Sequence, residues 1–154
     1  MPSWRLHEEA ARRFLRELGL NVSPDVIRAV NRLVDFPREF LSKPEVRELL
    51  EEKAKSPLDK ALVAILLDPK LKPLDELAMH DWGAWGEGLG VNALRRISEL
   101  LFGEAGRLLA ELHLALDAAF KGVELDRLDP LVKGFVNRYL ARRTAESRPW
   151  SANG

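Results

Sequence analysis

Proline positions constrain the fold of this 154-residue chain more than any other feature of its sequence. Proline fits the first turn of an α-helix but breaks a helix interior, because it lacks an N–H group and its ring clashes with the preceding turn. Four prolines stand where helical apolar spacing begins. These predicted helix starts are Ser23-Pro24-Asp25, Lys43-Pro44-Glu45, Ser56-Pro57-Leu58-Asp59 and Asp129-Pro130. In the third start we expect Ser56 to cap the helix and Asp59 to complete an acidic variant of the capping box.

Between the prolines, apolar residues recur every three or four positions, which is the period of an amphipathic helix rather than of a strand. The longest such signal runs from Ala93 to Gly122, with Gly103 as a break point and Gly122 as a C-terminal stop. The pattern predicts helices at 3–19, 24–35, 44–55, 57–67, 74–82, 92–121 and 130–146. Because short connections favour antiparallel neighbours, we expect an all-α fold: a compact bundle of about six to eight short-to-medium helices with short loops.

The chain length is that of one domain. At this size roughly 68–70% of the unfolded surface can be buried, so the core needs neither disulfides nor a metal. We predict a single helical domain over residues 1–146 and a C-terminal tail over 147–154. The longest unbroken apolar run, Ala61 to Leu67, is far shorter than the roughly 20 residues that span a bilayer. With no apolar signal-peptide core in the first residues, we expect the protein to work where it is made.

Charge is balanced overall but is unevenly distributed. The 24 Lys and Arg residues match the 24 Asp and Glu residues, which removes the simplest argument for nucleic-acid binding, and the absence of cysteine excludes thiolate chemistry. Residues 61–90 carry a net charge of −3, whereas residues 133–150 carry +4. The basic end of one copy can therefore match the acidic middle of another, or it can contact phosphates.

A glycine-rich segment, residues 83–90, follows Trp82 and contains Trp85. A phosphate-binding loop is not predicted there, because no Gly-Lys-Ser/Thr ending is present and Glu87 would repel phosphate. The two indoles have large apolar surfaces that something must cover. Either they fill the chain's own core or they are buried against another copy, and the enrichment of Trp at interfaces favours the second interpretation. Trp150 in the polar tail is a third candidate for self-association.

Two rows of arginine are predicted on helix surfaces. Guanidinium groups suit phosphates as well as carboxylates, so one interpretation is contact with a nucleic-acid backbone, and the alternative is a solvated face with ordinary ion pairs. The candidate residues are Arg5, Arg12 and Arg16 on the first helix and Arg138, Arg142 and Arg143 on the last.

The run Met79-His80-Asp81-Trp82-Gly83 resembles the HD metal-dependent phosphohydrolases. In that family a histidine early in an all-helical bundle, a His-Asp pair and a later Asp hold one or two metals, and the metal activates water against a phosphate ester. The resemblance implies that the metal ligands would be His7, His80, Asp81 and one of Asp117, Asp126 or Asp129. The structural alternative is a histidine at a helix end beside an Asp that caps the helix or lies on the surface.

Arg107 and His113 form an Arg-x5-His pair that resembles the HEPN ribonucleases. Those small helical bundles use such a pair, without metal, to cleave RNA at a site built across a dimer. The alternative is that His113 lies on a buried or partly buried helix face.

In overall character the chain is similar to the all-helical coat proteins of filamentous viruses of hyperthermophilic archaea: it is small, free of cysteine, rich in Arg and built of consecutive short helices. The resemblance implies subunits that pair around double-stranded DNA, with Arg and Lys neutralising phosphates and no reading of bases. We therefore favour a non-enzymatic structural subunit over the two enzymes.

That interpretation sets the remaining expectations. The partners would be the protein itself or a related subunit, together with double-stranded DNA. We expect no catalytic residue, metal or cofactor. The protein would be located in a virion, or in the cytoplasm if it is not a coat protein, and its source would be a hot environment.

Overall fold

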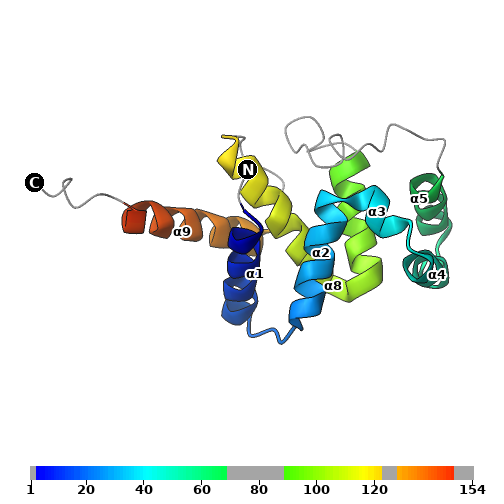
Figure 1. The fold of residues 1–154 in the computed structure, drawn as a ribbon, viewed down its shortest axis with the longest axis horizontal. Coiled ribbons are helices and arrows are strands. Elements are labelled where there is room, and N and C mark those ends of the chain that lie inside the picture. Colours follow the sequence, from blue (N-terminus) through cyan, green and yellow to red (C-terminus); the bar gives the residue numbers. More distant parts are fainter. Residues whose placement is uncertain (1–2, 69–88, 123–127, 148–154) are drawn as a thin grey trace, which may run out of the picture.

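The structure is a computed structural model that describes residues 3–68, 89–122 and 128–147. Within these ranges the chain forms α-helices and no strand, which confirms the predicted all-α bundle (Figure 1). The predicted helix at 74–82 lies outside the described residues. The helices are α1 (Trp4–Leu18), α2 (Pro24–Asp35), α3 (Pro37–Leu41), α4 (Pro44–Lys53), α5 (Pro57–Leu67), α8 (Leu89–Phe120) and α9 (Pro130–Ser147).

The helix starts follow the proline pattern. Pro24, Pro44, Pro57 and Pro130 each occupy the first position of a helix, as the sequence predicts. The Ser56 hydroxyl oxygen accepts a hydrogen bond from the backbone N–H of the third helical residue at 3.1 Å, which is an N-cap.

Asp59, expected to complete the capping box, also ties α5 to α8. Its carboxylate accepts two hydrogen bonds from the Arg96 guanidinium, at 2.9 and 2.7 Å. These bonds, against the opposing effect of burial, hold the pKa of Asp59 below its usual value. The residue therefore serves the tertiary structure as well as the helix start.

Helix α3 is the one described helix that the sequence pattern did not predict. It spans five residues and begins at Pro37, directly after Phe36, whose side chain cannot cap a helix. A single turn is too short to show a helical period. Its Phe40 and Leu41 are nevertheless buried in the core, so packing rather than local sequence explains this turn.

The helices are arranged around α2 and α8, which lie side by side in the middle of the molecule, with α1 and α9 toward one end and α4 and α5 at the other (Figure 1). At the α1–α9 end, Phe14 packs edge-on against Phe135 with ring centres 5.3 Å apart, and Phe135 stacks on Tyr139. The same hydrophobic core contains fully buried leucines, among them Leu33, Leu94 and Leu112.

The long helix α8 is broken at Gly103, as the sequence predicts. Gly103 has φ 75° and ψ −166°, a backbone conformation that is essentially restricted to glycine. Three residues later, a Cβ atom on Gly106 would lie 2.5 Å from the carbonyl oxygen of Ser98 and 2.6 Å from Cβ of Phe102. The first glycine therefore allows the bend, and the second allows the two halves of the helix to approach each other.

No helix within the described part of the chain is long and apolar enough to cross a membrane.

The bend gives a testable prediction with a matched control. We expect Gly103→Ala to lower the free energy of unfolding by about 1–3 kcal/mol, because alanine is strained at that φ and ψ. Gly134→Ala in α9 should instead raise it by up to about 1 kcal/mol, because Gly134 is helical and its new Cβ would meet only the flexible end of Arg138. Urea unfolding followed by circular dichroism measures both changes. Equal effects of the two substitutions would contradict the claim that the bend requires glycine at position 103.

A buried histidine–aspartate cluster as the candidate functional site

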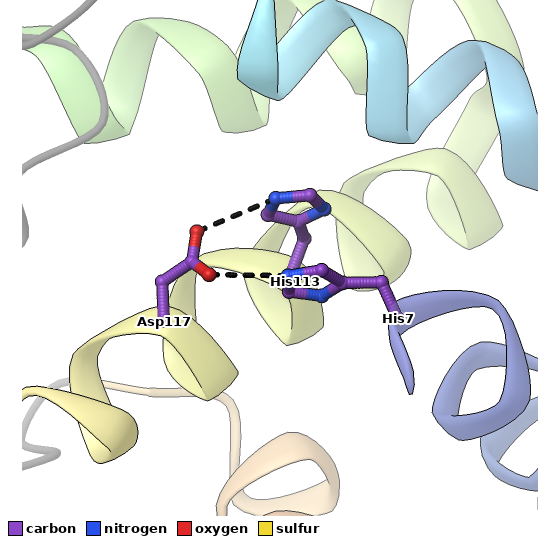
Figure 2. A group of neighbouring side chains, drawn as sticks. All are labelled: His7, His113 and Asp117. Carbon is purple, nitrogen blue, oxygen red and sulfur yellow. Dashed lines mark hydrogen bonds and ion pairs between the residues drawn. The ribbon is translucent and has the colours of Figure 1, made fainter. Parts of the chain in front are cut away.

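Five polar side chains from three helices meet in the interior of the bundle, and we name them the histidine–aspartate cluster. Its members are His7 of α1, Asn31 and Asp35 of α2, and His113 and Asp117 of α8. Figure 2 shows the two imidazole rings lying over each other beside the Asp117 carboxylate. The residues from α2 are four positions apart, as are those from α8, so each pair lies on one face of its helix.

The cluster is almost sealed from solvent. His7 is 4% exposed, and His113 and Asp117 are each 2% exposed. The Asp35 side chain, at 12%, is the most accessible of the acidic and imidazole groups. Because a buried polar group without a partner is strongly destabilising, most of the polar atoms here are expected to find partners within the cluster.

The distances define a continuous network. Asp117 bridges the two imidazoles, with Oδ1 3.1 Å from Nε2 of His7 and Oδ2 3.3 Å from Nε2 of His113. The same Nε2 of His113 lies 3.0 Å from Oδ1 of Asp35, and its Nδ1 lies 2.8 Å from Oδ1 of Asn31. The two rings are stacked with their centres 3.7 Å apart and their planes 3° apart.

His113 carries a positive charge in this geometry. Both of its ring nitrogens face oxygen atoms, two of them in carboxylates and one in an amide, and these oxygens only accept hydrogen bonds. Burial disfavours the charged form, but the hydrogen bonds to Asp117 and Asp35 outweigh burial and raise the pKa of His113 above its ordinary value. His113 therefore donates from both nitrogens.

His7 is neutral by the same reasoning. Burial is the largest effect on its pKa and lowers it, the hydrogen bond to Asp117 opposes this shift, and the neighbouring positive charge of His113 adds to it. The neutral ring donates from Nε2 to Asp117. Its Nδ1 is buried without a hydrogen-bond partner among the described residues. A neutral imidazole thus lies stacked on a charged one.

Arg107, the partner of His113 in the HEPN resemblance, belongs to a different cluster. Its guanidinium lies 3.5 Å from Oε2 of Glu111 and 3.4 Å from Oδ2 of Asp129, and the fully buried Glu111 also pairs with Arg95. This ion-pair network joins α8 to the residue that precedes α9. The described structure therefore does not bring Arg107 and His113 to one site within the chain.

Two residues that the HD resemblance named do meet. His7 and Asp117 are hydrogen-bonded, although 110 positions separate them in the sequence. Asp129 is not with them, because it contacts Arg107. His80, Asp81 and Asp126 lie outside the described residues, so the structure places only part of that ligand set.

Asn31 and Asp35 were not predicted from the sequence as site residues, and neither was the contact between His113 and His7. A local signal was present: His113 and Asp117 stand four positions apart in an otherwise apolar stretch of α8, and Asn31 and Asp35 are also four positions apart in α2. Only the packing of α1, α2 and α8 decides that these faces meet.

The six candidate arginines all lie on the surface of α1 and α9, which are neighbours. Arg138 contacts Glu17 at 3.0 Å, and the guanidinium groups of Arg13 and Arg143 lie 5.7 and 5.9 Å from the ring centre of Tyr139. These contacts bring the two rows, which the sequence placed on separate helices, close to each other.

Several of these arginines are available to a ligand. Arg12 and Arg16 line a hollow of about 550 Å³ between α1 and α2. Arg12 makes only a long contact to Glu8, at 3.9 Å. Within the part of the chain that the structure describes, Arg5, Arg16 and Arg142 make no ion pair. The tryptophans predicted for self-association, Trp82, Trp85 and Trp150, lie outside the described residues.

Comparisons with protein-family models, with curated proteins and with solved structures found no match to this chain. The chemistry of the described side chains is therefore the basis on which a function can be proposed.

The protonation of the cluster predicts how stability depends on pH. Because folding raises the pKa of His113, protonated His113 adds to the free energy of unfolding. This contribution is fully present below pH 6.5, the ordinary pKa of histidine, and is lost as the pH rises through the folded-state pKa. The effect of His7 is the opposite, because folding lowers its pKa. Neutral His7 contributes fully to the free energy of unfolding above pH 6.5, and this contribution is lost as the pH falls toward the folded-state pKa. Together they predict a maximum of the unfolding free energy near pH 6.5.

Urea unfolding of chelator-treated protein between about pH 5 and 8.5 tests this prediction. His113→Gln should flatten the alkaline side of the profile, and His7→Gln should flatten the part of the acid side just below pH 6.5. An alkaline side that is already flat in the unmodified protein would contradict the positive charge on His113.

Proposed function

We propose that this protein is a non-enzymatic structural subunit that associates with copies of itself or a related subunit and holds double-stranded DNA by its phosphate backbone. The observation that carries the proposal is the set of exposed arginines on the adjacent helices α1 and α9, three of which have no ion-pair partner among the described residues. Guanidinium groups held on rigid helices are suited to phosphate oxygens.

The charge of these two helices supports contact with the backbone rather than with bases. Helix α9 carries four basic residues and one acidic residue, and α1 carries four basic and three acidic residues. From Arg5 to Arg16 the row extends about 16 Å along α1. Since B-DNA carries one charge per about 1.7 Å of its axis, such a row can neutralise more than one phosphate.

The sealed position of the histidine–aspartate cluster supports a structural role over a catalytic one. A general acid or base must come within about 3 Å of the reacting group of its substrate. His7, His113 and Asp117 are almost completely buried, and Arg107 is engaged by carboxylates.

The assembly that we propose is the coat of a filamentous virus of a hyperthermophilic archaeon. The basis is the similarity of overall character: a small, cysteine-free chain of consecutive helices with arginine on its surface. Subunits of this kind need no base-specific contact, which agrees with exposed arginines on helix surfaces.

DNA binding gives a quantitative prediction. Arg12→Gln combined with Arg16→Gln should weaken binding to a double-stranded oligonucleotide to a similar extent whatever its base sequence. The slope of log K against log salt should fall in magnitude by about 2, because each lost phosphate contact reduces it by about 1. Fluorescence anisotropy at several salt concentrations measures both quantities.

Arg47→Gln is the matched control, because Arg47 is an exposed arginine of α4 at the opposite end of the molecule. It should leave the affinity and the salt slope unchanged. Equal losses in the control and the double variant, or no binding by the unmodified protein at 50 mM salt, would overturn the proposed DNA contact.

Self-association is tested separately. We expect sedimentation velocity of the unmodified protein to show concentration-dependent assembly that Trp82→Ala with Trp85→Ala reduces, because buried indoles contribute strongly to interfaces. Trp4→Ala is the control, because Trp4 packs on Phe36 and beneath Arg32 within the chain. A strict monomer at all concentrations, with and without DNA, would refute the proposed assembly.

A further inference from the structure

We propose that the exposed apolar side of α5 is a self-association surface, and that it pairs with α5 of a second copy running in the opposite direction. We name this surface the α5 stripe, and its members are Leu58, Ala61 and Ile65. The inference rests on the self-association proposed above, for which it names a surface among the described residues. It does not depend on DNA binding.

Helix α5 is strongly apolar, yet little of it is buried. Eight of its eleven residues are Ala, Val, Leu or Ile, whereas its buried residues are Asp59 and Val63. The Leu58 side chain is 80% exposed, the largest value among the large apolar side chains of the described residues, and Ile65 is 38% exposed. Single exposed apolar residues are common, but several on one side of a helix indicate a surface that another molecule covers.

The exposed apolar residues and the buried residues lie on different sides of α5. With about 100° per residue, the α5 stripe falls within an arc of about 60°. Asp59 and Val63 lie on the other side, where the Asp59 carboxylate accepts two hydrogen bonds from Arg96 of α8, at 2.9 and 2.7 Å. Helix α5 lies beside α4 at the edge of the bundle (Figure 1). The stripe is therefore on a helix that is already folded and held in place, so pairing requires little further ordering of the backbone.

The α5 stripe is suited to contact with a copy of itself. It contains no charged residue, so two stripes in contact bury no ion. The small side chain of Ala61 lies between the larger side chains of Leu58 and Ile65, and two helices approach closely where a large side chain of one fits over a small side chain of the other. A two-fold axis between two copies forms each such contact twice.

The charges at the two ends of α5 favour the antiparallel orientation. Lys55 precedes the helix and Asp68 directly follows it, and both residues are exposed. Antiparallel pairing brings Lys55 of each copy toward Asp68 of the other, whereas parallel pairing would bring like charges together. An anionic partner, such as a membrane surface, would be attracted by Lys55 but repelled by Asp68. The charge pattern therefore favours a second α5 as the partner.

The size of the stripe predicts how strong the pairing is. Interfaces of standard size bury about 800 Å² per partner, and three side chains on each copy supply less than this. Pairing through α5 alone is therefore weak. In an assembly with further contacts it becomes effective, because the partner is already held nearby.

Cross-linking tests which side of α5 meets the second copy. The chain contains no cysteine, so one cysteine can be introduced at a chosen position of the full chain. We expect Ala61→Cys to give covalent dimers with a short bifunctional thiol reagent, because Ala61 is central in the stripe and lies near the two-fold axis. Lys60→Cys, at an exposed position of the same helix outside the stripe, is the matched control and should give few dimers.

Equal cross-linking of the two cysteine variants, or none in Ala61→Cys, would overturn the α5 pairing. Thiol labelling of the Ala61→Cys monomer at low concentration provides a second check. Rapid labelling is expected, whereas slow labelling would show that another part of the same chain covers the stripe and would also overturn the inference.

Substitution of Leu58 tests the contribution of the stripe to association. Leu58→Lys should weaken self-association in sedimentation velocity by about tenfold or more, because it places a charge at the centre of a small apolar contact. The Tm should stay unchanged, because the Leu58 side chain is mostly exposed in the single chain. Leu131→Lys, which changes a 52% exposed leucine of α9, is the control and should leave association unchanged.

Equal losses in Leu58→Lys and Leu131→Lys would refute the stripe. If the unmodified protein associates and Leu58→Lys has no effect, this surface is wrong while the proposed assembly stands. A strict monomer at all concentrations would refute both.

A charge exchange tests the antiparallel orientation. Lys55→Glu and Asp68→Lys should each weaken association, because each places like charges at both ends of the paired helices. The two substitutions together should restore it, because the opposite charges meet again with their signs exchanged. A double variant that associates no better than the single variants would overturn the antiparallel pairing.

Discussion

The bundle depends on the contact between Asp117 and two histidines, because this contact joins the helices that surround the core. One carboxylate of α8 binds a histidine from α1 and a histidine from its own helix, and the second histidine reaches Asn31 and Asp35 of α2. In an apolar interior such groups are tolerated only when nearly all their donors and acceptors are paired. The network therefore favours one arrangement of α1, α2 and α8 over others that would bury equal apolar area. Removing one partner would leave a charge or a polar group unsatisfied, so the members act together.

Two further polar contacts connect the ends of the bundle to this centre. Asp59 accepts two hydrogen bonds from Arg96 and holds α5 against α8, while Arg107 joins α8 to Asp129, which directly precedes α9. The bend at Gly103 directs the two halves of α8 toward these contacts. The interior thus serves cohesion, whereas Arg5, Arg16 and Arg142, which make no ion pair with another described residue, lie on the outer faces of α1 and α9. This division between a polar network inside and guanidinium groups outside agrees with a subunit that acts by contact with other molecules.

Most of the secondary structure could be predicted from the sequence, because helix starts and helical periodicity are local properties. Pro24, Pro44, Pro57 and Pro130 mark observed first turns, and Gly103 marks the observed break, since only glycine tolerates that conformation. Helix α3 could not be predicted, because a single turn after Phe36 has no cap and no period of its own. The candidate site was predicted only in fragments: His7, Asp117 and His113 were each named, but in two different resemblances, and Asn31 and Asp35 were not named at all.

The sequence by itself determined that the chain is helical, where its helices begin and which faces are apolar, because these follow from backbone sterics and side-chain spacing within a few residues. Only the tertiary structure decided which polar residues meet. His7 and Asp117 are 110 positions apart, and no local pattern says that α1 and α8 bring them within 3.1 Å. It also decided that His113 is charged while His7 is neutral, because a pKa depends on burial and on neighbours that only packing supplies.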